Sequence, residues 1–80
     1  MYYGRGKLEV NMTEQEQNDL YDQRIAEWTQ LDRDERLRRA AVYQQQYPKG
    51  EYLFMYRKYM ERGMDPLGAY LKWIWIDKGL

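Results

Sequence analysis

The sequence predicts an all-α protein, a compact bundle of about four short helices with an extended N-terminal arm. Apolar residues recur every three or four positions over most of residues 13–80, which is the period of a helix with one buried face. Helix-start and helix-stop residues divide this region into segments at about 14–31, 33–46, 51–62 and 66–78. We expect residues 1–80 to form a single domain, in which 1–12 are the arm and 13–80 the bundle.

The first helix is expected to follow Thr13. Thr13 and Glu16 fit a capping box, in which each side chain accepts a hydrogen bond from the other residue's backbone N–H. The apolar stripe of this helix comprises Leu20, Tyr21, Ile25, Trp28 and Leu31. Gly4 and Gly6 resist helix formation, so the preceding residues are predicted to form the arm.

The second helix is expected to start at Asp32, whose carboxylate can cap it, with Glu35 completing a second capping box. Its predicted buried face comprises Leu37, Ala40, Ala41 and Gln44, with Val42 and Tyr43 beside it. Pro48 ends this helix because the residue before a proline avoids the helical conformation. The following Lys49 and Gly50 indicate a turn.

The third helix has the clearest periodicity. Its apolar residues at positions i, i+3, i+4, i+7 and i+8 are Tyr52, Met55, Tyr56, Tyr59 and Met60. Gly63 is placed to take the left-handed conformation that ends many helices, and Met64 is placed as the apolar residue that follows it.

The fourth helix is predicted to start with Asp65 as N-cap and Pro66 in the first helical position. Its main apolar stripe comprises Leu67, Tyr70, Leu71, Ile74 and Trp75, while Trp73 and Ile76 fall on another side. A helix that is apolar nearly all round needs either a central position or a partner. Gly79 is expected to end it. The alternative is a strand over residues 70–76, because aromatic and β-branched residues are enriched in strands.

Composition excludes several kinds of chemistry. The sequence has no cysteine and no histidine, so disulfides, thiolate or imidazole zinc sites and Cys–His nucleophile pairs are impossible. The acidic residues lie mainly at helix starts, and Asp32, Asp34 and Glu35 are explained as a cap with first-turn acids. We therefore expect no enzyme, catalytic residue, metal site or cofactor. The apolar runs are too short to span a bilayer, and we expect a soluble, cytoplasmic protein with no membrane partner.

Charge is unevenly distributed along a chain whose net charge is zero. Residues 1–35 hold nine acidic and four basic residues, a net charge of −5, and residues 36–80 hold the reverse, a net charge of +5. We favour attraction between the two halves over a basic binding surface. Nucleic acid remains the alternative partner, through a basic surface on the second and third helices comprising Arg36, Arg38, Arg39, Arg57, Lys58 and Arg62, interleaved with Tyr43 and Tyr47. A pI near 6.2 disfavours it.

The favoured hypothesis is a non-catalytic protein-binding module, an adaptor or inhibitor that docks on a larger assembly. Thirteen aromatics and five methionines are more than so small a bundle is expected to cover, and these types are enriched in interface cores. Size and lack of cofactor chemistry resemble the blocking proteins of phages and mobile elements. A homodimer through the fourth helix is compatible with either function. The expected partner-binding residues are Arg36, Arg39, Tyr43, Tyr56, Lys58, Tyr59, Arg62, Trp73 and Trp75.

Overall fold

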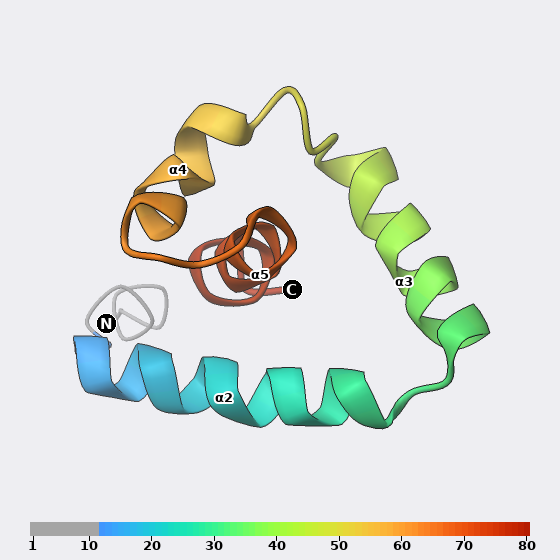
Figure 1. Cartoon of the computed structure of the whole chain (residues 1–80), viewed down its shortest axis with the longest axis horizontal. Helices are drawn as coiled ribbons and strands as arrows, with labels where there is room; N and C mark the ends of the chain where they lie inside the picture. The colour runs from blue at the N-terminus through green and yellow to red at the C-terminus, as the bar shows by residue number, and fades with distance from the viewer. Residues whose placement is uncertain (1–11) are drawn as a thin grey trace, which may run out of the picture.

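The computed structural model describes residues 12–80, which form four α-helices and one π-helical turn. These elements are α2 (Glu14–Gln30), α3 (Arg33–Gln46), α4 (Leu53–Glu61), α5 (Pro66–Lys72) and η1 (Trp73–Asp77). Figure 1 shows α2, α3 and α4 as three sides of a frame, with α5 and η1 seen end-on inside it. The predicted all-α bundle is confirmed. The predicted arm lies outside the described residues except for Met12, whose backbone carbonyl accepts a hydrogen bond from the Gln17 side chain.

The helices start at the predicted caps. The Thr13 hydroxyl accepts from the Glu16 N–H at 3.1 Å and the Glu16 carboxylate accepts from the Thr13 N–H at 2.9 Å, so the capping box is complete. Asp32 accepts from the Glu35 N–H at 2.8 Å. The second capping box is only half made, because the Glu35 carboxylate pairs with Arg38 and Arg39 instead.

α4 starts two residues later and ends one residue earlier than predicted. Glu51 and the N-cap residue Tyr52 direct their N–H groups to the Pro48 carbonyl and so belong to the preceding turn. At the other end Gly63 has a φ of 103°, its N–H bonds to the Met60 carbonyl, and the Met64 N–H bonds to the Tyr59 carbonyl. This is the Schellman arrangement that satisfies the last carbonyls of a helix.

The fourth predicted helix is α5 continued by η1. Asp65 caps α5 by accepting from the Gly68 N–H, and Pro66 occupies the first turn. In η1 the Lys78 N–H reaches the Trp73 carbonyl five residues back, and Gly79 with a φ of 74° ends the helix. The alternative of a strand over residues 70–76 is wrong. A lone buried strand would leave its backbone groups without partners, whereas a helix bonds them internally.

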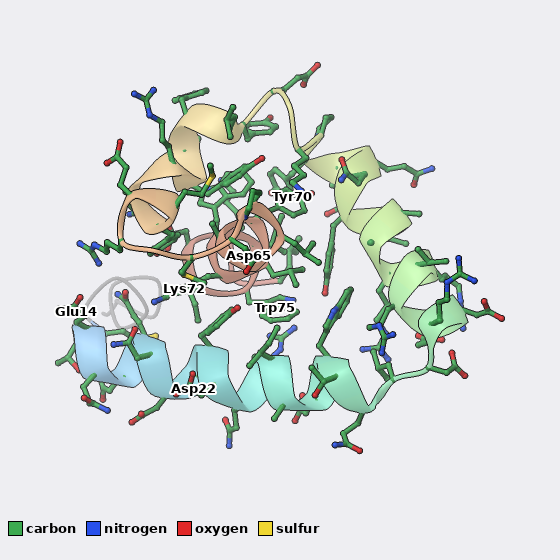
Figure 2. All side chains as sticks on the ribbon, in the orientation of Figure 1. Glu14, Asp22, Asp65, Tyr70, Lys72 and Trp75 are labelled. Atoms are coloured by element: carbon green, nitrogen blue, oxygen red, sulfur yellow. The ribbon has the colours of Figure 1, made fainter. Side chains whose placement is uncertain are left out.

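The central helix is buried on every side. Every residue from Gly68 to Trp75 is buried, which the sequence predicted for a helix with a central position. Trp73 packs its ring against four tyrosines from the α3–α4 side and from α5 itself, namely Tyr47, Tyr52, Tyr56 and Tyr70. Trp75 packs against Tyr21 and Trp28 of α2. Figure 2 shows Tyr70 and Trp75 on different sides of this helix.

The predicted inner face of α3 is wrong by about a quarter turn. The residues of α3 and of its C-terminal cap that pack toward the core are Arg36, Ala40, Tyr43 and Tyr47, which also recur at helical spacing. Leu37 and Ala41 are exposed. Tyr43 and Tyr47 bury more apolar surface against the core than Leu37 and Ala41 could, which favours this orientation of the helix. Among the residues described, none on α3 is fully buried.

Stability is expected to fall at alkaline pH because of Tyr70. Burial raises the pKa of Tyr70 to about 12, above the value near 10 of a free tyrosine, and its hydroxyl donates to the Tyr47 carbonyl at 2.6 Å. The folded state therefore holds the neutral form, and this contribution is complete below pH 10 and is lost as the pH rises to 12. The expected loss is on the order of 2 kcal/mol, measured by urea unfolding between these pH values.

The control for this prediction is Tyr70→Phe, which removes the ionisable hydroxyl. Its free energy of unfolding should change less between pH 10 and 12 than that of the native protein. Burial and the Asp77 carboxylate also raise the pKa of Tyr59, so some pH dependence is expected to remain. An identical decrease in both proteins would contradict the assignment to Tyr70.

Candidate functional site

The four large aromatics expected to contact a partner are core residues. Tyr56, Tyr59, Trp73 and Trp75 are each no more than 4% exposed. Three of them have a hydrogen-bond partner within the protein: the Tyr56 hydroxyl donates to the Lys49 carbonyl at 2.6 Å, the Tyr59 hydroxyl to Asp77 at 2.9 Å, and the Trp75 indole N–H to the Tyr43 hydroxyl at 2.9 Å. An aromatic side chain with a satisfied polar end can be buried completely. These four residues therefore cannot serve as surface anchors in this fold.

Tyr43, another predicted contact residue, holds α3 to the core. Its ring stacks on Trp28 with a centroid separation of 6.3 Å, and its hydroxyl accepts a hydrogen bond of 2.9 Å from the indole N–H of Trp75. The tyrosine is half-buried and faces inward. Its position is explained by the packing of the bundle.

The predicted basic residues do not form one surface. Arg39 lies on α3, whereas Lys58 lies on α4 and Arg62 caps its end, and these two helices flank different sides of the central helix (Figure 1). Each of the three has a carboxylate partner, in Glu35, Asp77 and Glu14 respectively. The Glu14–Arg62 pair also joins the acidic and basic halves of the chain, as predicted for charges that attract within the fold.

Arg36 differs from the other predicted basic residues. It was expected on the outer arc of its helix, but it is half-buried and donates a hydrogen bond to the Leu31 carbonyl at the end of α2. Among residues 12–80 no carboxylate forms an ion pair with it. A guanidinium has five N–H donors, so donors remain for another acceptor.

Lys72 is the one charged residue buried among those described, and no sequence pattern distinguishes it from the other lysines. Its ammonium donates to the Asn18 side chain at 2.8 Å and lies 4.9 Å from the ring centroid of Tyr59 and 5.7 Å from that of Tyr21. Figure 2 shows it on the side of the central helix near the start of α2. Ring faces attract cations. Since Lys72 lines none of the cavities described here, we assign it a structural role.

A groove of about 450 Å³ lies between α2 and α5 and ends at α3. Its walls are mainly apolar, and the residues that line it include Tyr21, Ile25, Trp28, Arg36, Leu67 and Leu71. Gly68 lies at its edge, where an added Cβ would be 2.9 Å from Asp65 Oδ1 and 3.2 Å from the Tyr21 hydroxyl oxygen. Burial raises the pKa of Tyr21, and the charge of Asp65 adds to this. Asp65 is therefore close to Tyr21 in the groove. We call this cavity the α2–α5 groove.

The first turn of α4 exposes three large apolar residues in succession. Leu53 is 45% exposed, Phe54 69% and Met55 41%. We call these three residues the α4 patch. Among the aromatics of the described chain, Phe54 alone is exposed. Sequence reasoning assigned Met55 to the buried face and did not consider Phe54, although a helical projection of α4 places Phe54 opposite Tyr56 and Tyr59.

Other kinds of site have no support in the described residues. Within residues 12–80 no group of three or more acidic side chains could hold a metal ion. Within the same range no helix has the length and apolar character needed to cross a membrane. Comparison with protein-family models, curated proteins and solved structures finds no match to this chain.

Removing the Tyr43 hydroxyl is expected to destabilise the fold. In Tyr43→Phe the buried indole N–H of Trp75 loses its acceptor, which should lower the free energy of unfolding by about 1–3 kcal/mol. Tyr47→Phe is the matched control, because within the described residues the Tyr47 hydroxyl makes no hydrogen bond, and it should change stability by less than about 0.5 kcal/mol. Chemical denaturation of both variants checks this, and equal effects would contradict it.

Proposed function

We propose that this protein is a non-catalytic protein-binding module, an adaptor or inhibitor that contacts a larger assembly through the α4 patch. The observation that carries the proposal is the exposure of three consecutive large apolar residues, Leu53, Phe54 and Met55, at the start of α4. The proposed function is the one that composition favours. The proposed contact residues differ, because the aromatic residues that were expected to contact a partner lie in the core.

The α4 patch makes little contribution to the fold. α4 packs on the central helix through Tyr56 and Tyr59, on the opposite side from Phe54. No side chain caps the first turn of α4, so Leu53 and Phe54 have no part in capping this helix. A large aromatic held in water costs solvation free energy that a partner's apolar pocket recovers. Such residues, surrounded by polar ones, are typical of binding hot spots.

The charges beside the α4 patch indicate the sign of the charge expected on the partner's surface. Arg57 and Lys58 follow Phe54 by three and four residues, which places them on its side of the helix. Both ion pairs that they make are weak: Arg57 is 3.4 Å from Glu61, and Lys58 is 3.5 Å from Asp77. We propose a partner surface with an apolar pocket whose rim carries acidic groups.

Nucleic-acid binding has less support. The six basic residues considered for it are divided between α3 and α4, which flank different sides of the central helix, so they form no single basic surface, and Arg36 is half-buried (Figure 1). A nucleic-acid-binding protein uses basic side chains to neutralise phosphates, and the counterions condensed on the nucleic acid are released. The net charge of zero adds no long-range attraction.

The main test replaces the centre of the α4 patch. Phe54→Ser should fold normally, because the side chain is exposed, and should weaken binding to the partner by roughly 30-fold or more, as truncation of a hot spot does. The partner is obtained by affinity purification from the source cells, identified by mass spectrometry and purified, and its affinity is measured by calorimetry.

Leu37→Ser is the matched control, since Leu37 is 56% exposed on α3, away from the α4 patch. It should retain the affinity of the native protein. A partner that binds the Phe54 variant as tightly as the native protein would exclude the α4 patch as the contact surface.

A second test addresses nucleic acid directly. In a gel-shift titration at low salt we expect no retarded band with single-stranded or double-stranded DNA or RNA at micromolar protein. Electrostatic binding is strongest at low salt, so a band that appears there and is lost on adding salt would favour the alternative function.

A further inference from the structure

The α2–α5 groove has an ordered arrangement of charge. Arg36 lies at one end, where it bonds to the Leu31 carbonyl, and Asp65 lies at the other, beside Tyr21. Tyr21 and Leu31 are ten residues apart on α2, which corresponds to roughly 15 Å along a helix. Between these ends the walls are apolar and include Ile25, Trp28, Leu67 and Leu71. The groove therefore runs from a cation through an apolar section to a carboxylate.

The α4 patch carries the opposite order. Glu51 precedes Phe54 by three residues, and Arg57 follows it by three. Glu51 lies in the turn before α4 and Arg57 lies within the helix, so one charged residue stands on each side of Phe54 along the chain, and their long side chains reach outward from the backbone. Both are exposed, and Arg57 has only a solvent-exposed partner in Glu61. Along the chain, an acid therefore precedes the α4 patch and a base follows it.

We propose that the α4 patch of one molecule binds in the α2–α5 groove of a second copy of this chain. Phe54 enters the apolar section, Glu51 pairs with Arg36 and Arg57 pairs with Asp65 of the other copy. The inference rests on the proposed function, since it names a partner for the same α4 patch. A cavity of about 450 Å³ is within the range that accepts a ligand of this size.

The contact must join two molecules. α4 and α2 lie on different sides of the central helix, so the α4 patch cannot reach the groove of its own chain (Figure 1). Arg36 gains the carboxylate that it lacks within residues 12–80, and its remaining N–H groups can donate to both oxygens of that carboxylate in a bidentate pair.

Such an assembly is head-to-tail. Each molecule offers one patch and one groove, and these are different surfaces, so every added copy leaves a free patch at one end and a free groove at the other. The assembly grows with protein concentration unless its rotation closes a ring. A symmetric dimer, in which the α4 patches of two copies meet, would have neither property.

The test uses one variant for each surface. Phe54→Ser removes the aromatic from the patch. Leu67→Glu places a carboxylate in the wall of the groove at an exposed position in the first turn of α5, where helices favour acids, so the fold should persist. Circular dichroism checks the fold of each. Leu37→Glu is the matched control for the second variant.

Sedimentation equilibrium and light scattering give the outcome. The native protein and Leu37→Glu should show a mass that rises with concentration, and each single-surface variant alone should remain a monomer. An equimolar mixture of Phe54→Ser and Leu67→Glu retains one intact groove and one intact patch. It should form a heterodimer and nothing larger.

Three results would overturn the inference: a native protein that stays monomeric to millimolar concentration, self-association that survives Leu67→Glu, or a mixture that stays monomeric. These failures are separable from failure of the proposed function. Binding of a foreign partner requires Phe54 but not the groove, so that partner should bind Leu67→Glu normally even where self-association is absent.

Discussion

The bundle depends on the complete burial of one helix. From Gly68 to Trp75 every side chain of α5 and η1 is buried, so no face of this helix can be directed to water. Trp73 and Trp75 project to opposite sides and contact aromatics from the surrounding helices. This short chain surrounds the buried helix with three others, α2, α3 and α4 (Figure 1). Loss of either indole would leave a cavity that the frame could not close.

Burial of so many tyrosines and tryptophans requires partners for their polar atoms. The hydroxyls of Tyr56 and Tyr70 donate to backbone carbonyls in the segment between α3 and α4, and the indole N–H of Trp75 donates to Tyr43. These bonds fix the position of each ring and attach the α3 side of the frame, which has no fully buried residue of its own among those described. The aromatic content thus reflects the needs of a small core.

Because the core contains most of the aromatic side chains, few large side chains remain exposed to form a binding site. Five of the eleven basic side chains within residues 12–80 are paired with carboxylates, and three of the seven exposed large apolar residues in this range lie at the first turn of α4. The α2–α5 groove contains the one predicted basic contact residue that has no such pair. Recognition between the α4 patch and the α2–α5 groove would rest on shape and electrostatics. It needs no reactive side chain.

The sequence by itself determined the four helices and most of their ends. Thr13, Asp32, Asp65 and Gly63 act through hydrogen bonds or backbone angles within a few residues, so their effect does not depend on the rest of the fold. The tertiary structure decided which faces are buried. The sequence could not distinguish core from surface aromatics, because burial depends on how the helices are placed around α5. The rotation of α3 that brings Arg36 inward, and the exposure of Phe54, both follow from that placement.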